Sequence, residues 1–173
     1  VMGGGIAAHL ANAGIRVHLL DMIPPGGGGR SSLAEAALQR LRGAEPPPFM
    51  DPAAAERVIP GNLEDHLGRL AEADWIVDAV IEDSAVKRSL LARLERVRRP
   101  GSVVSSNTST IPLRVLAAGM PDSFRQDFLI THFFNPPRFM RLLELVAGPE
   151  TRPAAVAAVR HCADRRLGKG VVM

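Results

Sequence analysis

The apolar residues of the chain follow two kinds of spacing that alternate along the sequence. Short apolar runs, typical of buried strands, are predicted at 16–20, 75–80, 102–105, 128–131, 142–146 and 170–173. Between them, apolar residues recur every three or four positions, which predicts helices at 3–13, 31–41, 63–73, 84–97, 112–118 and 151–166. Strands that alternate with helices in this way form βαβ units. The pattern therefore predicts an α/β fold, doubly wound, with a mainly parallel sheet.

Length and turn-forming segments indicate a single domain. A chain of 173 residues can bury a substantial core. Segments rich in Gly and Pro at 24–29 and 45–52 predict loops, and no internal repeat is present. We therefore expect residues 1–173 to form one domain. Because the sequence opens in a helical pattern and closes in a strand pattern, we also expect this domain to be truncated at both ends.

Three consecutive glycines, Gly3 to Gly5, lead into the first predicted helix. Rossmann-like folds bind dinucleotides with a Gly-x-Gly-x-x-Gly turn, where helix N–H groups and the helix dipole face the pyrophosphate. If Gly3 is the third glycine of this motif, a strand and Gly-x-Gly precede Val1. Asp21 ends the next strand, where an acid binds ribose hydroxyls and favours NAD over NADP. A glycine-rich helix start with a surface aspartate is the alternative interpretation.

A polar segment, SSNTSTIP at 105–112, follows the predicted strand 102–105. Loops at the carboxyl ends of parallel strands form the ligand crevice of an α/β fold. Asn107 offers an amide and Ser109 a short hydroxyl to such a crevice. Taken alone, the segment is more typical of a cap for the helix that begins at Pro112.

A histidine and a glutamate on neighbouring predicted strands form the second candidate site. His132 ends an apolar strand, Asn135-Pro136-Pro137 breaks the chain, and Glu144 lies inside the apolar run LLELV. A carboxylate buried in such a strand is costly without a partner. A single His or Glu of this kind is more often structural, but together they are a candidate base and the group that orients it. The carboxylate would select one imidazole tautomer and stabilise the cation.

Composition limits the partners and the compartment. The net charge is +3, and we expect the arginines between 88 and 99 to lie on a solvated face. Tyr is absent and Trp75 is the single tryptophan, so no aromatic and basic stripe indicates nucleic-acid binding. The single cysteine, Cys162, excludes an intrachain disulfide and a multi-cysteine metal site, and it fits a reducing cytoplasm. No apolar run is long enough to span a membrane, and no signal-peptide pattern opens the chain.

Taken together, these segments resemble the NAD-binding domain of L-3-hydroxyacyl-CoA dehydrogenase, the enzyme of fatty-acid β-oxidation. The matching segments span the whole chain and occur in the same order as in the family. It is carried by VMGGGIAAHLANAG at 1–14, the strand ending at Asp21, DAVIED at 78–83 with Lys87, SSNTS at 105–109, THFFNPP at 131–137, MRLLELV at 140–146 and GKGVV at 168–172. HFFNP followed by the in-strand glutamate is its most specific part. The sequence is most similar to bacterial members, including those fused to an enoyl-CoA hydratase.

The resemblance implies four catalytic roles. His132 is the base that takes the proton of the 3-hydroxyl as hydride leaves C3 for the nicotinamide. Glu144 pairs with His132 and orients it. Ser109 lies near the substrate hydroxyl and the nicotinamide. Asn135 helps to hold the substrate carbonyl and the cofactor.

The resemblance also implies the cofactor, the substrate and the partners. The cofactor is NAD, no metal is required, and the substrate is a 3-hydroxyacyl-CoA thioester. Residues that border the cofactor are Met2, Gly3, Asp21, Ala79, Val80, Ile81, Glu82, Lys87, Ser109 and Asn135. A helical C-terminal domain that completes the substrate site and the dimer interface is expected after residue 173. The whole protein is then a homodimer or part of a multifunctional β-oxidation enzyme, and residues 1–173 alone are expected to be inactive.

Two alternatives remain open. The first is a relative that acts on 3-hydroxybutyryl-CoA in another pathway. The second is a catalytically silent NAD-binding or structural protein on the same fold. The presence of both His132 and Glu144 argues against the second alternative.

Overall fold

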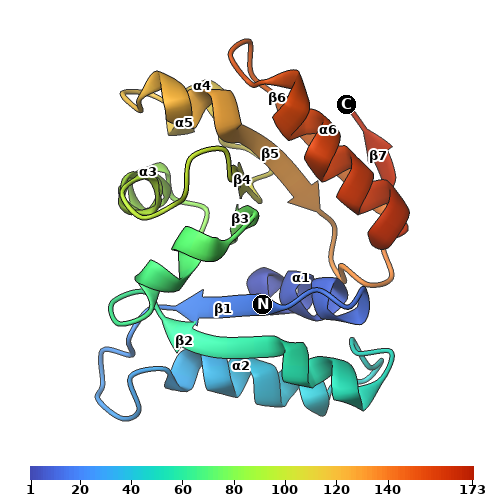
Figure 1. Ribbon diagram of the computed structural model, residues 1–173. Helices are drawn as coiled ribbons and strands as arrows, with labels where there is room; N and C mark the ends of the chain where they lie inside the picture. Colours follow the sequence, from blue (N-terminus) through green and yellow to red (C-terminus); the bar gives the residue numbers. More distant parts are fainter. The chain divides into compact units, whose positions relative to one another are not determined.

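Seven strands form two sheets in the computed structural model, which describes all residues 1–173 (Figure 1). Contacts divide the chain into two compact units. The first unit contains residues 1–69 and 135–140, and the second contains residues 70–134 and 141–173. Every strand pairing except one is parallel. The predicted α/β class with mainly parallel sheets is therefore confirmed.

The first unit is built on a pair of parallel strands. Its elements are α1 (Met2–Asn12), β1 (Val17–Asp21), α2 (Ser32–Arg42), the 3-10 helix η1 (Pro52–Arg57) and β2 (Val58–Asn62). Strand β1 pairs with β2 from Val17 opposite Val58 to Asp21 opposite Asn62. The small residues of α1 pack against η1 and β2 in one apolar cluster that includes Ala7, Ala8, Ala11, Leu38, Phe49 and Val58. Alanines let these elements approach closely, and Val17 and Leu19 of β1 pack against the same cluster.

The second unit is built on a sheet of order β3-β4-β5-β6-β7. Its strands are β3 (Trp75–Asp78), β4 (Val103–Ser106), β5 (Phe128–Phe133), β6 (Leu142–Ala147) and β7 (Gly170–Val172). Its helices are α3 (Ser84–Glu95), α4 (Leu113–Leu116), α5 (Asp122–Asp127), α6 (Pro153–His161) and the π-helical turn η3 (Cys162–Arg166). Strands β5 and β6 are antiparallel.

The two faces of this sheet carry different residues. On one face, Leu129 and Leu145 pack with Ala155 and Val159 of α6. On the other face, the strand registers place Asp78 beside Ser106, Ser106 beside Ile130, and Ile130 beside Val146. His132 and Glu144 also lie on this second face, because side chains alternate along a strand: His132 is two residues after Ile130 in β5, and Glu144 is two residues before Val146 in β6. Asp78, Ser106, His132 and Glu144 thus lie on the face opposite α6.

The helix predicted at 63–73 is wrong. The structure has strand β2 at Val58–Asn62, a turn, and only a 3-10 helix, η2, at Leu67–Glu72. Pro60 and Gly61 hid the strand because both are rare in strand interiors, whereas a two-stranded sheet tolerates them. Asn62 then ends the strand, since its side-chain oxygen accepts hydrogen bonds from the N–H groups of Glu64 and Asp65. The short helices η1 and α5 were not predicted either.

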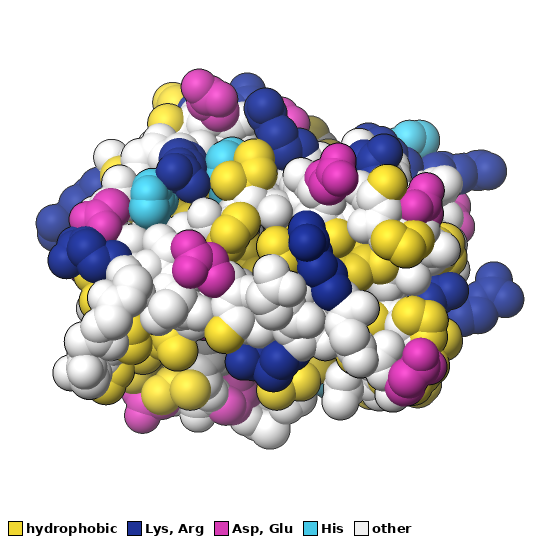
Figure 2. All heavy atoms as spheres, turned by 90° about the horizontal axis from the view of Figure 1, so that it is seen from below, with side chains coloured by type: hydrophobic (Ala, Val, Ile, Leu, Met, Phe, Trp, Pro, Cys, Tyr) yellow, Lys and Arg dark blue, Asp and Glu magenta, His cyan; other side chains and the backbone are white.

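The expectation of a solvated arginine face is wrong for Arg98. Its side chain is 3% exposed, and its guanidinium donates hydrogen bonds to Glu95, Asp127 and the carbonyls of Ser102 and Ser123. Asp127 also pairs with Arg152. Helix spacing alone does not show that α5 covers this position. Figure 2 shows one face of the molecule, on which basic and acidic side chains are interspersed.

Candidate active site

His132 and Glu144 form a hydrogen bond across β5 and β6. They are directly opposite each other in the antiparallel register, and His132 Nδ1 lies 2.9 Å from Glu144 Oε2. The ring of Phe134 packs against the imidazole with ring centroids 4.5 Å apart. The carboxylate and the aromatic ring together fix the ring plane. Since Nδ1 donates to Glu144 in the neutral imidazole, Nε2 is the nitrogen that can accept a proton.

The prediction that Glu144 is buried is wrong. Its side chain is 48% exposed, against 21% for His132. Alternation along β6 explains the difference, because Leu143 and Leu145 point into the core and place Glu144 on the open face. Leu142 and Val146 share that face and are also exposed. The carboxylate therefore keeps part of its hydration while it orients the imidazole.

A cleft of about 470 Å³ opens beside the His132–Glu144 pair. Its polar lining includes Thr108, Ser109 and Thr110 from the loop after β4, together with His132 and Glu144. Its apolar lining comes from Ile111, Leu113, Ile130, Val146 and Ala147. The structure therefore brings three of the four predicted catalytic residues, Ser109, His132 and Glu144, to one cavity of the second unit. An apolar cavity with a few convergent polar groups is typical of a small-molecule site.

The loop that carries Ser109 is fastened by Glu82. One carboxylate oxygen, Oε1, accepts four hydrogen bonds, from the Thr108 hydroxyl, the Ser109 N–H (3.2 Å), the Thr110 N–H (3.3 Å) and the Thr110 hydroxyl (3.1 Å). Burial acts to raise the pKa of the Glu82 carboxyl, but the hydrogen bonds from Thr108 and Thr110 and the nearby Lys87 ammonium outweigh it. The pKa therefore lies below its usual value, and Glu82 is a carboxylate at neutral pH.

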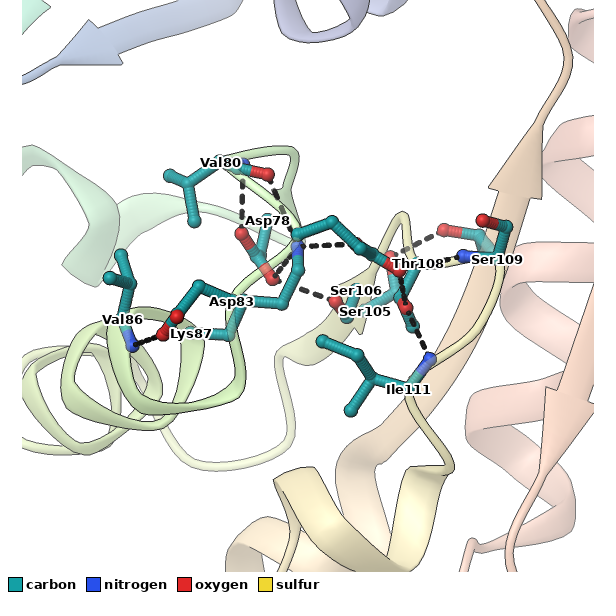
Figure 3. Close-up of polar contacts among 12 residues, drawn as sticks. Asp78, Val80, Asp83, Val86, Lys87, Ser105, Ser106, Thr108, Ser109 and Ile111 are labelled. Carbon is teal, nitrogen blue, oxygen red and sulfur yellow. Dashed lines mark hydrogen bonds and ion pairs between the residues drawn. The ribbon is translucent and has the colours of Figure 1, made fainter.

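The predicted cofactor residue Lys87 is completely buried. Its Nζ lies 3.0 Å from Asp78 Oδ2 and 3.4 Å from the Val80 carbonyl oxygen (Figure 3). Ala79 and Val80 are partly buried, and Ile81 and Glu82 are exposed. The exposed part of this segment can contact a ligand, whereas the Lys87 ammonium holds the segment from inside.

The predicted cofactor residues of the first unit lie at the start of α1, at the end of β1 and in the turn around Asn135. The first turn of α1 contains Gly3 and no acidic residue, so its N–H groups face no negative side chain of that turn. A Cβ atom at Gly5 would lie 3.0 Å from Pro137 Cδ, so this turn requires glycine for close packing. The exposed Asp21 ends β1 and its Oδ1 accepts the N–H of Met22 at 2.8 Å. Met2 begins α1, and Asn135 is exposed beside a cis bond to Pro136.

The remaining candidate groups do not form a second site. Burial raises the pKa of the Cys162 thiol, which disfavours the reactive thiolate. His66 lies before η2 and accepts the Asn62 N–H at 3.0 Å, so it has a local partner that the sequence did not indicate. No group of His, Cys, Asp and Glu side chains is suited to hold a metal ion. No helix combines the length and the apolar character needed to cross a membrane.

Sequence reasoning missed three buried polar residues next to the site: Asp78, Ser106 and Thr108. Each lies at or just beyond the carboxyl end of β3 or β4 and is at most 3% exposed. Asp78 is the last residue of the apolar run WIVD. Asp21 was identified as a candidate because it occupies the equivalent place at the end of its strand. An acid at a strand end with a lysine nine residues later was the available signal.

The fold and the paired side chains are those of a Rossmann-type dehydrogenase domain, and comparison with known proteins gives the family. The family described as "3-hydroxyacyl-CoA dehydrogenase, NAD binding domain" matches residues 1–173. The chain belongs to this family, and NAD is the cofactor of the family domain.

Relatives of known sequence and structure agree with this assignment. A Deinococcus radiodurans protein named "Probable 3-hydroxyacyl-CoA dehydrogenase" is 42% identical over 173 residues, covering 100% of this chain and 50% of the relative. A Rickettsia felis protein named as a fatty acid oxidation complex trifunctional enzyme is 34% identical, over 99% of this chain and 24% of the relative. The crystal structure of 3-hydroxybutyryl-CoA dehydrogenase from Escherichia coli K12 superposes with a TM-score of 0.81 at 27% identity, covering 99% of this chain and 35% of that one. The chain therefore spans half or less of the length of these relatives.

Proposed function

We propose that the protein containing this domain oxidises L-3-hydroxyacyl-CoA to 3-ketoacyl-CoA with NAD, in fatty-acid β-oxidation. The observation that carries the proposal is the 2.9 Å contact between His132 Nδ1 and Glu144 Oε2, at a cleft that Ser109 also lines. Family membership supports the cofactor and the substrate class. The name of the Rickettsia relative supports the pathway.

His132 acts as the general base. A secondary alcohol releases hydride readily only when its hydroxyl proton leaves as well. His132 Nε2 takes that proton, and Glu144 keeps Nδ1 protonated and stabilises the imidazolium that results. The carboxylate also restricts ring rotation, because it holds Nδ1. Proton transfer from the substrate oxygen to Nε2 is thus the step that this chain performs itself.

Ser109 and Asn135 position the substrate. The Ser109 side chain is exposed at the cleft and can hydrogen-bond the reacting oxygen beside His132. The exposed Asn135 amide can donate to the thioester carbonyl, which would polarise it and hold it. The apolar lining, including Ile111, Ile130 and Val146, is suited to the acyl chain.

NAD supplies the hydride acceptor when bound, and each unit contributes predicted cofactor residues. In the first unit, Met2 and Gly3 at the start of α1 face the pyrophosphate, and Asp21 accepts hydrogen bonds from the adenosine ribose. In the second unit, Ala79, Val80, Ile81 and Glu82 follow β3 along the cofactor. Lys87 contributes by holding this segment rather than by direct contact.

The domain functions as part of a longer protein. We propose that residues 1–173 form its NAD-binding domain, and that further segments complete the acyl-CoA site and an oligomer interface. The share of each relative that the chain covers supports this arrangement. We place the protein in the cytoplasm because its single cysteine fits a reducing compartment.

An assay of the intact protein tests the proposal. Purified protein is supplied with NAD and L-3-hydroxyacyl-CoA thioesters of several chain lengths, and NADH formation is recorded. We expect turnover of L but not D thioesters, over more than one chain length. Turnover of the four-carbon thioester alone would favour the 3-hydroxybutyryl-CoA alternative, which the name of the Escherichia coli relative supports. Binding of NAD without any turnover would favour the catalytically silent alternative.

A further inference from the structure

A buried ion pair lies at the carboxyl end of β3, on the same face of the sheet as the candidate site. The Lys87 and Asp78 side chains are both 0% exposed, with Nζ 3.0 Å from Oδ2. Asp78 also accepts the Ser106 hydroxyl (2.7 Å) and the Val80 N–H (3.0 Å). Removing two charges from water is costly, and apolar residues of the same volume often give equal stability. Stability alone therefore does not account for this pair.

The pair is connected outward to Glu82. Lys87 Nζ donates to the Val80 carbonyl at 3.4 Å and lies 3.7 Å from Glu82 Oε2. These contacts fix both the backbone between β3 and α3 and the carboxylate at its exposed end. Helix α3 begins at the same place, because the Asp83 side chain accepts the N–H of Val86 at 2.9 Å (Figure 3).

Glu82 in turn holds the loop that carries Ser109. The carboxylate oxygen that faces away from Lys87 accepts hydrogen bonds from Thr108, Ser109 and Thr110. Thr108 is 2% exposed, and its hydroxyl oxygen also accepts the Ile111 N–H at 3.0 Å. A continuous chain of polar contacts therefore runs from Asp78 through Lys87 and Glu82 to Thr108 and Ser109.

The sheet register relates this chain of contacts to the cleft. Asp78 and Ser106 lie in one row with Ile130 and Val146, which line the cleft beside His132. The Ser106 hydroxyl thus secures Asp78 to the same strands that support the cleft.

We propose that Asp78, Lys87 and Thr108 are positioning residues that act through Glu82 to hold Ser109 at the cleft before any ligand binds. The proposal rests on the proposed function, since it takes Ser109 as a substrate contact. Fixing this loop in advance removes the cost of ordering it during each catalytic cycle. Loss of the network should therefore lower kcat.

Hydrogen exchange tests the positioning role without turnover. In the intact protein, millisecond exchange is measured at the Ser109 and Thr110 amides for Thr108→Val, with Thr108→Ser as the matched control. The valine is nearly isosteric but lacks the hydroxyl, whereas the serine keeps it. We expect exchange at both amides to be about tenfold faster in the valine variant and unchanged in the serine variant. Equal exchange in all three proteins would overturn the proposal.

A double-mutant comparison tests whether the buried pair acts on the same loop. Asp78→Asn/Lys87→Met removes both charges, and it is combined with Thr108→Val. We expect each change to lower kcat about tenfold and the combination to lower it little further, because both release one loop. If the fold-losses in kcat of the two changes multiply in the combined variant, the buried pair and Thr108 act independently, which would contradict the proposal. Ser106→Ala, which removes one hydroxyl donor to Asp78, gives the same comparison if the neutral pair does not fold.

The two measurements separate this proposal from the proposed function. An intact protein without dehydrogenase activity would contradict the proposed function, while the exchange rates at Ser109 and Thr110 would still decide whether the network holds the loop. An active protein with unchanged exchange would leave the function standing and remove the positioning role.

Discussion

His132 and Glu144 lie directly opposite each other on antiparallel strands, with His132 Nδ1 2.9 Å from Glu144 Oε2. Glu144 follows His132 by twelve positions, and the segment between them contains the turn around Asn135, which returns the chain alongside itself. The pair is therefore fixed by backbone pairing on both sides rather than by a flexible loop. This is the geometry that a base and its orienting carboxylate require.

Replacing Glu144 by Gln should slow the reaction without abolishing it. The amide keeps the shape of the side chain but loses the charge that stabilises the imidazolium, so kcat should fall by about 10 to 100-fold. The pH dependence of kcat/KM should change as well, because the base no longer faces a carboxylate. Steady-state kinetics over a pH series measures both effects. A pH profile identical to wild type would exclude the pairing from catalysis.

Replacing Asp21 by Asn should weaken NAD binding and reduce discrimination against NADP. The amide loses the charge that repels a 2′-phosphate and accepts ribose hydrogen bonds less well. We expect about tenfold weaker binding of NAD by calorimetry. Asp51→Asn is the matched control, because Asp51 is an exposed cap of η1 in the same unit and its affinity for NAD should not change. Equal affinity in the two variants would remove the ribose contact.

Lys169 should make stability depend on pH in the alkaline range. Burial lowers the pKa of its ammonium from 10.5 to about 8. The unfolded chain therefore binds more protons between these values, so the unfolding free energy rises with pH across this window. At pH 7 the charged, buried side chain should make the wild type less stable than Lys169→Met, by ~1–3 kcal/mol. This difference in the free energy of unfolding should become smaller as the pH rises toward 10.5, because Lys169 loses its charge. A difference that stays constant would contradict the lowered pKa of Lys169.

Arg98 should contribute much more to stability than its neighbour Arg99. Arg98→Met leaves the buried carboxylate of Asp127 without one of its partners, which should destabilise the protein by about 3–5 kcal/mol. Arg99 pairs with Asp74 at the surface, where its side chain is 49% exposed, so Arg99→Met should change stability by less than about 1 kcal/mol. Denaturant unfolding of both variants provides the comparison, and equal losses would show that the Arg98 cluster carries no special stability.

The sequence predicted those helices and strands that are defined by residues within or next to the element itself. Helices α1, α2 and α3 and strands β1, β3 and β4 lie within one or two residues of the predicted ranges, because apolar spacing and flanking Gly, Ser or Pro define them. Strand β2 was missed because Pro60 and Gly61 act against strand formation locally, and only its pairing with β1 compensates. Arg98 was misjudged because its burial depends on α5, which lies 24 or more residues farther along the chain.

The sequence indicated individual residues of the candidate site, but it did not indicate how their side chains are arranged in space. Position at strand ends indicated Ser109 and His132, yet their sharing of one cleft follows from the parallel registers of β4 and β5. The exposure of Glu144 follows from the phase of alternation along β6, which the apolar run LLELV does not reveal. Lys87 was indicated by resemblance, but its burial against Asp78 requires the fold.

The central claim is that His132 is the base of an NAD-dependent 3-hydroxyacyl-CoA dehydrogenase. The most direct measurement compares turnover and NAD binding in the intact His132→Gln variant, with the exposed His161→Gln as the control. We expect kcat with an L-3-hydroxyacyl-CoA to fall by about 10³-fold or more in the first variant and to stay at the wild-type value in the second. Calorimetry should give the same affinity for NAD in all three proteins. Wild-type turnover in His132→Gln would contradict the account.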